Sequence, residues 1–341
     1  MWYILSPHGN NEKNHMTLLD FILTNLLNPA IMCFILGIIA VLSHSNLSLD
    51  TKIFDTIAIY MLLAIGIKGG MKISHSNIVS MILPIAATLS VALITTMLAY
   101  ILLRSIGKID YINAASIAAH HGSVSVVTFM AATAYLAAYS VEYEPFMTAL
   151  VAILEIPSII IALSIVHMKH RNGLKRIPSI IIKSLFTKSI LLLVGGLLIG
   201  IVTHESHHED LKIFFELPFK GVLCLFLLQM GITTAKNWGE LKKVGKFLVI
   251  FNIIIPIPFA IIGILFGKIA GLSVGGATLL GVMAASSSYI AVPAAMKASL
   301  PEANQSLPLV STLGINMPFN IVIGITIYYY LAQVIYKNLI W

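Results

Sequence analysis

A polar interruption lies near the middle of an otherwise apolar run from Asp110 to Ala138. It reads AAHHGSVS over Ala118–Ser125. Polar groups without partners cost several kcal/mol each in hydrocarbon, so such a stretch persists only inside protein or beside a water-filled cavity. A span that is merely kinked, with Ser and His bonded to their own backbone, is the simpler alternative. We expect a broken membrane helix.

The chain repeats this pattern in its second half. AASSSYIAV over Ala284–Val292 matches Ala118–Val126 at a constant shift of 166 residues. Two further matches keep the same order at shifts of 165 and 161, namely Leu62–Ile67 on Leu227–Ile232 and Glu155–Pro157 on Asn316–Pro318. These anchors indicate an internal duplication. Interrupted helices at corresponding places in two halves point to the binding site of a secondary transporter.

Composition supports an integral membrane protein. Hydrophobic residues make up 58% of the chain and charged residues only 10%, whereas a soluble domain is about a quarter charged. The net charge of +7 is carried by loops, which indicates membrane topology and not nucleic-acid binding. The two cysteines, Cys33 and Cys224, lie in apolar runs and indicate neither a disulfide framework nor a metal site.

A membrane span needs about 20 apolar residues, and the sequence predicts ten spans in an all-α protein. The first five are Phe21–Leu42, Ile53–Gly69, Ile78–Leu103, Asp110–Ala138 and Phe146–His167. The second five are Ser189–Thr203, Leu217–Thr234, Phe247–Phe266, Val274–Ser299 and Leu307–Tyr336. The predicted parts are a polar N-terminal extension (1–18), a first five-helix repeat (19–167), a basic linker (168–188) and a second five-helix repeat (189–341).

An odd number of spans per half predicts that the second repeat enters the membrane upside down, as an inverted repeat. The loops after odd-numbered spans carry 14 of the 21 Lys and Arg residues. This side is predicted to be cytoplasmic, and both termini are predicted to be outside. The linker 168–188 would then face the cytoplasm. His204–Asp210 would form a solvated outer loop, a reading preferred over a metal site.

Each broken helix has a carbonyl end with partial negative charge and an amide end with partial positive charge. In an inverted repeat the two breaks face each other at mid-membrane. Two amide ends can then hold a small anion, while carbonyl ends and Ser hydroxyls can hold sodium. Gly122 would let the backbone approach the anion closely. Neither break contains Lys or Arg, which favours charge balance by a co-transported cation.

Glu155 is the carboxylate predicted deepest in a span, just before Pro157, and its repeat equivalent is Asn316, before Pro318. An acid within the membrane indicates a functional residue. A protonated, purely structural Glu155 is the alternative. Each proline frees a backbone carbonyl one turn earlier, which could add oxygen ligands. Asn320 and Gln229 are further polar candidates within predicted spans.

At these residues the chain resembles the SbtA-like, sodium-dependent bicarbonate transporter family. The resemblance rests on HGSVSVVTF over His121–Phe129, EIP over Glu155–Pro157, LLQMG over Leu227–Gly231, SYIAVPAA over Ser288–Ala295, PEAN over Pro301–Asn304 and PFN over Pro318–Asn320. These segments follow one another in the family's order and span most of the chain.

The resemblance implies a ten-helix 5+5 inverted repeat with core and gate domains, working as a homotrimer by an elevator-type motion. It implies sodium-dependent uptake of bicarbonate across a bacterial inner membrane, with a PII-like cytoplasmic regulator in some members. The bicarbonate site would be lined by Gly122, Ser123, Val124, Ser288, Tyr289 and Ile290. The sodium site would involve His121, Ser125, Ser286 and Ser287. The polar residues beside the two prolines, Glu155 and Asn316, are further candidates for this site.

Three alternatives remain at this point. Related inverted-repeat architectures include a sodium/proton antiporter, in which Glu155 would carry the cation, and a symporter of another small organic anion. A third reading, an intramembrane hydrolase, would use Ser123 or Ser125 with His120 or His121. A nucleophilic serine needs a base within hydrogen-bond reach, and adjacent positions on one helix do not face each other. We therefore expect a transporter and not an enzyme.

Overall fold

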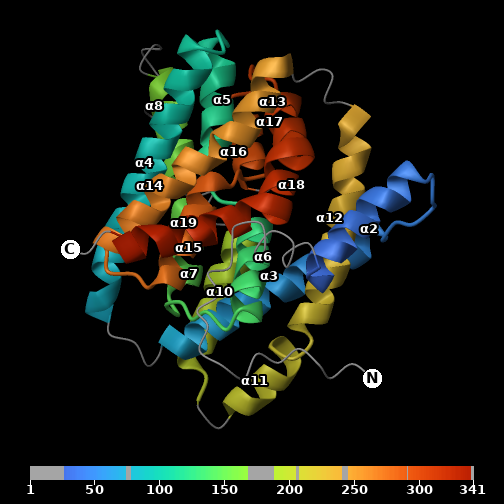
Figure 1. Ribbon diagram of the computed structural model, residues 1–341, viewed down its shortest axis with the longest axis vertical. Helices are drawn as coiled ribbons and strands as arrows, with labels where there is room; N and C mark the ends of the chain where they lie inside the picture. Colours follow the sequence, from blue (N-terminus) through green and yellow to red (C-terminus); the bar gives the residue numbers. More distant parts are fainter. Residues whose placement is uncertain are drawn as a thin grey trace.

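The computed structural model describes residues 27–73, 78–167, 188–204, 207–239, 245–289 and 291–338. All regular secondary structure in these ranges is helical, which confirms the all-α prediction. The predicted N-terminal extension (1–18) and nearly all of the predicted linker (168–188) lie outside the described residues. The remaining helices form one elongated bundle, with α5 and α8 near one end and α11 at the other (Figure 1).

The helices before the linker are α2 (Pro29–Leu42), α3 (Thr51–Ile73), η1 (Ile78–Met81), α4 (Ile82–Ser105), α5 (Tyr111–His121), α6 (Val126–Ala138), α7 (Met147–Leu154) and α8 (Pro157–His167). The helices after it are α10 (Lys188–Val202), α11 (His208–Phe215), α12 (Phe219–Asn237), α13 (Gly245–Ile254), α14 (Pro256–Ile269), α15 (Val274–Ala285), α16 (Ala291–Ser299), α17 (Ser306–Ser311), η5 (Thr312–Asn316), α18 (Met317–Phe319), η6 (Asn320–Gly324) and α19 (Ile325–Asn338).

Six helical stretches of the described chain are long and apolar enough to cross a membrane: Thr51–Met71, Val79–Ser105, Tyr111–Ala138, Met147–Val166, Gly245–Ile269 and Ser306–Asn338. Three shorter apolar helices, Pro29–Leu42, Leu191–Val202 and Val274–Ala285, lie where the sequence also predicts spans. The structure therefore supports a multi-pass membrane protein, and the full number of ten crossings stays a prediction.

Side-chain caps explain where several of these helices begin. Asn28 accepts a hydrogen bond from the amide of Ala30 at the start of α2, directly before a proline. Asp110 accepts from the amides of Ile112 and Asn113 at the start of α5. Ser273 caps α15 through the amide of Gly276. Such side chains satisfy backbone N–H groups that have no partner within the first turn of the helix.

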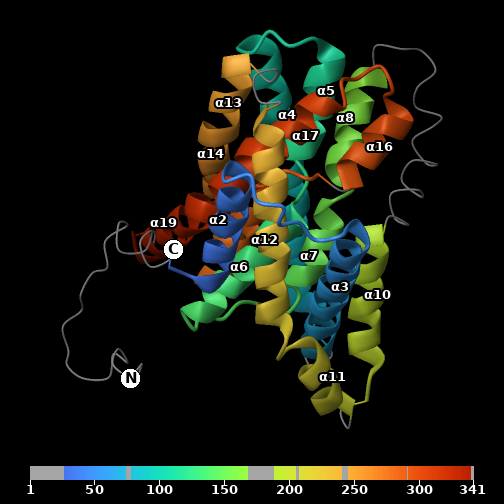
Figure 2. The same cartoon turned by 90° about the vertical axis from the view of Figure 1, so that its right-hand side faces the viewer.

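Two helix pairs pack through glycines. The helix α2 lies along α12, and a Cβ atom placed on Gly231 would overlap the carbonyl oxygen of Phe34 and lie 3.2 Å from Cα of Gly37. In the same way α3 lies along α10, and a Cβ on Gly66 would lie 2.6 Å from the carbonyl oxygen of Leu193. Figure 2 shows α3 and α10 side by side. Small residues permit this close backbone approach between membrane helices.

The broken span Tyr111–Ala138 is the most interior of the six. In the most apolar 18 residues of this span, 83% of the residues are buried inside the protein. The corresponding fraction in Val79–Ser105 is 39%. α4 and α8 cover α5, while α14 and α19 cover α15. The polar interruption is therefore shielded from lipid, as its sequence requires.

The structure departs from the sequence prediction at one connection that is predicted to lie outside. The segment His208–Phe215 forms the helix α11, whereas the prediction treated His204–Asp210 as a loop. Tyr60 of α3 explains the docking of α11, because its hydroxyl donates to the carbonyl oxygen of Phe214 at 2.7 Å and its ring stacks on Phe215. These contacts come from a distant helix, so the local sequence does not reveal them.

Candidate functional site

The first break separates α5 from α6. The helix α5 ends at His121, and the last hydrogen bond of the helix is donated by the amide of Gly122 to the carbonyl of Ala118. Residues 122–125 leave the helical path, and α6 begins at Val126 with Ser125 as its cap, because the Ser125 hydroxyl accepts from the amide of Thr128 at 3.2 Å. Every residue of 114–132 is buried. The break that the sequence predicts is present.

The second break separates α15 from α16. The helix α15 ends at Ala285, and Ser286 adopts an extended conformation with φ −81° and ψ 163°. The helix α16 begins at Ala291, and the side chains of Ser286, Ser287 and Ser288 between the two helices are buried. Ile290, predicted to line the anion site, lies outside the described residues.

The two breaks touch each other. The hydroxyl of Ser287 is hydrogen-bonded to Nδ1 of His121 at 3.0 Å. The amide of Ser288 donates to the carbonyl oxygen of His120 at 2.9 Å, and the amide of Ser125 donates to the hydroxyl of Ser286 at 3.0 Å. Residues more than 160 positions apart in the sequence thus form one buried polar cluster. Four of the predicted sodium-site residues, His121, Ser125, Ser286 and Ser287, belong to it.

Several polar atoms at and around the breaks are buried without a protein partner. Among the described residues, no hydrogen bond reaches the hydroxyl of Ser123 or Nε2 of either His120 or His121. These side chains are at most 1% exposed. A buried polar group left unpaired costs about 1–3 kcal/mol. A bound ion or water hydrogen-bonded to these atoms would remove that cost.

Asn316 lies at the carbonyl end of α15. Its Nδ2 donates to the carbonyl oxygen of Ala285 at 3.3 Å. Asn320 donates to Oδ1 of Asn316 at 3.0 Å and accepts from the hydroxyl of Tyr328 at 2.7 Å. Asn320 was a candidate on sequence grounds, whereas Tyr328 was missed. Its position eight residues after Asn320, on the same side of the helix, is the signal that could have identified it.

Glu155 lies between α7 and α8, two residues before Pro157, where α8 begins. Its side chain is 2% exposed, and Oε2 has no partner among the described residues. Among the described residues, no hydrogen bond joins Glu155 to the cluster at the breaks. Glu155 is thus a buried acid three residues before Ser158, whose hydroxyl is also buried and has no partner among the described residues.

The structure adds a packing contact at Gly122 and a hydrogen-bond donor at the carbonyl that Pro318 frees. A Cβ atom on Gly122 would overlap the hydroxyl of Thr96 and lie 3.1 Å from Cβ of Ser158, so α4 and α8 account for glycine here. The carbonyl of Gly314, which Pro318 frees, accepts from Nε1 of Trp238 at 3.2 Å and is not an open cation ligand.

Gln229 lies away from the breaks, where its Oε1 accepts from the amide of Leu49 at 2.9 Å. The remaining anion-site candidates lie beside the cluster. Val124 belongs to the main hydrophobic core, and the hydroxyl of Tyr289 lies 3.9 Å from Sδ of Met230 on α12. Tyr289 thus links the second break to the α2–α12 pair.

Comparison with known families decides the class of protein. Residues 29–333 match the Na⁺-dependent bicarbonate transporter superfamily. The chain belongs to this superfamily. The match includes both breaks and confirms the family resemblance seen in the sequence. No curated protein shows significant similarity to the chain.

Membership in the Na⁺-dependent bicarbonate transporter superfamily makes this protein a membrane transporter, for which sodium and bicarbonate are the ions that the family implies. The geometry also disfavours the hydrolase reading. Nδ1 of His120 bonds to the carbonyl of Ser116, and Nδ1 of His121 bonds to Ser287. Among the described residues, neither ring is hydrogen-bonded to Ser123 or Ser125, which is the contact that a general base for these serines would need.

Proposed function

We propose that this protein is a sodium-dependent symporter that takes up bicarbonate, a small monovalent anion, across a bacterial inner membrane. The observation that carries the proposal is the contact between two buried helix breaks that contain unpartnered polar atoms. A helix N-terminus attracts anions, because its first amides lack partners and carry partial positive charge. The protein would thus bind its anion without a lysine or arginine at either break.

The anion would lie between the amide ends of α6 and α16. Its neighbours would be the break residues Gly122, Ser123, Val124, Ser288, Tyr289 and Ile290. The free hydroxyl of Ser123 is the side-chain donor best suited to it, since it is buried and unpaired. Bicarbonate has both acceptor oxygens and an O–H donor, so it can satisfy amides and an imidazole nitrogen such as Nε2 of His121 at once.

Sodium, the second substrate, would bind at the carbonyl ends. Hard cations prefer oxygen ligands. The carbonyl of Ala285 and the hydroxyls of Ser125, Ser286 and Ser287 are the oxygens that lie around the contact between the breaks. His121 and Asn316 would position these groups, and Glu155 would supply negative charge within the membrane. A sodium ion beside the anion would balance its charge, which couples the two fluxes.

Pairwise contacts support the inverted 5+5 repeat. Gly66 and Gly231 are equivalent at a shift of 165 residues, and each packs a helix of one half against a helix of the other. At the shift of 166, His121 is equivalent to Ser287, and these two side chains are hydrogen-bonded. Contact between equivalent positions is expected where a two-fold axis passes.

The starts of the two broken helices support the same symmetry. Asn304, before α17, donates from its amide to Oδ1 of Asn113 in the first turn of α5 at 2.6 Å. Glu144, before α7, accepts from the amide of Ser273 at the start of α15 at 2.5 Å. The loop after each broken span thus holds the start of the other broken span.

We further propose that α2, α3, α10 and α12 form a gate domain and that the other helices form a core domain, which moves past the gate in an elevator-type cycle. The two glycine-packed pairs make the gate rigid. The family implies a homotrimer and a PII-like regulator as partners, and the orientation with both termini outside follows from the loop charges. These features stay proposals.

Uptake of labelled bicarbonate into proteoliposomes tests the proposal. Uptake is expected to require an inward sodium gradient, and potassium should not replace sodium. At two pH values that change the ratio of bicarbonate to CO₂, the rate should follow the bicarbonate concentration. Absence of sodium-dependent uptake by folded protein would contradict bicarbonate as the substrate, and other small carboxylates would then be tested.

The Glu155→Gln variant tests the cation site. Because the substitution removes a negative charge at nearly constant volume, the sodium concentration for half-maximal uptake is expected to rise about threefold or more. Glu302→Gln makes the same change at an exposed carboxylate and is the matched control. It should leave the sodium concentration for half-maximal uptake unchanged. An unchanged sodium dependence in Glu155→Gln would make Glu155 structural.

Burial and the unpaired Oε2 of Glu155 also favour a second candidate, a sodium/proton antiporter in which this carboxylate carries the cation. The two functions differ in one measurement. Sodium-driven proton movement in liposomes without bicarbonate, abolished in Glu155→Gln, would establish the antiporter and exclude the symporter.

The Ser287→Ala variant tests the contact between the breaks. It leaves Nδ1 of His121 buried without a partner, at a cost of about 1–3 kcal/mol, so uptake is expected to fall about tenfold with normal expression. Ser90→Ala is the control, because that hydroxyl bonds one turn back on α4. Equal uptake by both variants would remove the His121–Ser287 contact from the mechanism.

A further inference from the structure

A pocket of about 100 Å³ lies away from the helix breaks, between α3, α6 and the turn from α11 to α12. It lies toward the end of the bundle that α11 occupies in Figures 1 and 2. By the loop charges this end is the outer one. Helices of the proposed gate, α3 and α12, form one wall, and α6 of the proposed core forms the other.

The pocket follows one side of α6 toward the first break. Ala137, Thr133 and Phe129 line it at four-residue intervals, which places them in one row on the helix. Phe129 is three residues from Val126, where α6 begins. At 1.5 Å per residue the inner end of the pocket is therefore about one turn from the amides proposed to bind the anion.

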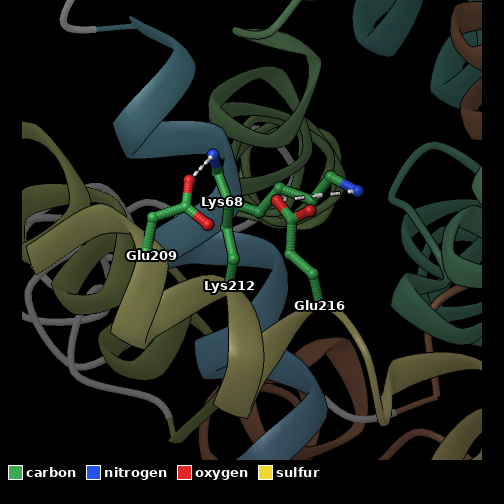
Figure 3. Close-up of polar contacts among 4 residues, drawn as sticks. All are labelled: Lys68, Glu209, Lys212 and Glu216. Atoms are coloured by element: carbon green, nitrogen blue, oxygen red, sulfur yellow. Dashed lines mark hydrogen bonds and ion pairs between the residues drawn. The ribbon is translucent and has the colours of Figure 1, made fainter.

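The charged lining of the pocket is predominantly positive. It contains Lys68 from α3, Lys220 from the first turn of α12, and the single acid Glu216. Nζ of Lys68 lies 3.9 Å from Oε1 of Glu216, an ion pair shown in Figure 3. Lys220 is exposed and makes no ion pair with a described residue. Among the described residues, one ammonium group of the pocket thus has no counter-charge.

A neutral donor lies beside these charges. Tyr143 lines the pocket, and burial together with the nearby Glu216 carboxylate raises the pKa of its phenol to about 12. The hydroxyl therefore stays protonated at neutral pH and can donate to an anion. The rest of the wall is largely apolar, including Phe129, Phe215 and Phe219. Charges in such a low-dielectric cleft concentrate ions of opposite sign.

We propose that this pocket is an outer anion-binding site that collects the small monovalent anion before it reaches the helix breaks. Lys220 supplies the attracting charge, and Glu216 limits the attraction by pairing with Lys68. The ion-pair equilibrium sets how much of the Lys68 charge is available. This inference rests on the proposed function, and it adds specific residues for the capture of the same substrate.

Opposite charge changes within the pocket give opposite predictions. In Lys220→Gln the bicarbonate concentration for half-maximal uptake is expected to rise about threefold at low ionic strength, with the maximal rate unchanged. In Glu216→Gln it is expected to fall by a similar factor, because Lys68 loses its counter-charge. Both effects should shrink at 0.15 M salt, where the Debye length is about 8 Å.

The neighbouring ion pair provides matched controls. Lys212 and Glu209 form an ion pair at 2.7 Å on α11, which Figure 3 shows beside the Lys68–Glu216 pair. Neither residue is among those that line the pocket. Lys212→Gln and Glu209→Gln make the same charge changes and are expected to leave half-saturation unchanged. Changes of the same size in these controls, or changes of one sign in both pocket variants, would overturn the proposal.

A second readout does not depend on transport. Ala137 is exposed in the pocket and can be replaced by cysteine after Cys33 and Cys224 are changed to serine. An anionic thiosulfonate reagent applied from outside is expected to react faster than a cationic one, and Lys220→Gln should lower this ratio about threefold. A ratio that does not respond to Lys220→Gln would overturn the outer site. The protein could show the expected ratio of anionic to cationic reaction rates but no sodium-dependent bicarbonate uptake. That outcome would support the anion pocket and reject only the proposed function.

Discussion

Replacing Gly231 by valine is expected to remove most of the folded protein from the membrane. The new side chain would overlap the carbonyl oxygen of Phe34, a backbone atom that cannot rotate away. Overpacking costs about 1–3 kcal/mol even where side chains can adjust, so α2 and α12 would have to separate. Detergent-solubilised protein should show lower monodisperse yield and a melting temperature reduced by roughly 5–10 °C.

Gly221 on the same helix provides the control. A Cβ atom there has no atom within 4 Å, so Gly221→Val tests the helix propensity of valine without the clash. It should retain near-normal yield and melting temperature. Gly37→Val should resemble Gly231→Val, because Gly37 faces the same contact from α2. Normal stability of Gly231→Val would mean that α2 and α12 are not in close contact in the membrane.

The Gly122→Val variant is expected to lose at least about tenfold in uptake while still inserting into the membrane. A Cβ atom at this position would overlap the hydroxyl of Thr96 and lie 2.8 Å from Cβ of Thr96, so the first break would be pushed away from α4. A displaced break separates His121 from Ser287 and moves the amide end of α6. Labelled bicarbonate uptake, normalised to the folded protein, measures the effect.

A second substitution distinguishes steric displacement from a filled anion site. Gly122→Ala introduces only the Cβ atom, and Thr96→Ala removes the hydroxyl that this atom would overlap. The double variant Gly122→Ala/Thr96→Ala should therefore show more uptake than Gly122→Ala alone. Gly195→Val is the control, since no atom lies within 4 Å of a Cβ there. If Thr96→Ala does not restore any uptake, Gly122 is needed because its backbone approaches the anion closely, as the sequence predicts.

Much of the site could be predicted because its residues conflict with their surroundings. Histidine, glycine and serine in the middle of an apolar run break the 3.6-residue pattern of a lipid-facing helix, and their repetition after 166 residues marks a second break. The structure contains both breaks at these residues. The same reasoning selected Asn316 as a cation-site candidate, through its equivalence to Glu155 in the repeat. The structure adds that Asn316 donates to the carbonyl of Ala285 at the end of α15.

Other features could not be predicted because they depend on partners far away in the chain. Glycine at position 122 is explained by Thr96 and Ser158, which come from two other helices. The carbonyl freed by Pro318 is taken by Trp238 of another helix. A sequence shows that a group needs a partner, but the identity of that partner depends on how the helices cross.

The sequence by itself determined a helical membrane protein with two matching polar breaks and the family to which it belongs. Hydropathy, helix-breaking residues and repeat spacing are local properties, and these features depend on them alone. Tertiary structure decided that the breaks touch through His121 and Ser287, that glycines join α2 to α12 and α3 to α10, and that lysines line a pocket between α3, α6 and α12. Those outcomes depend on packing between distant helices, where close backbone approach selects which polar groups meet.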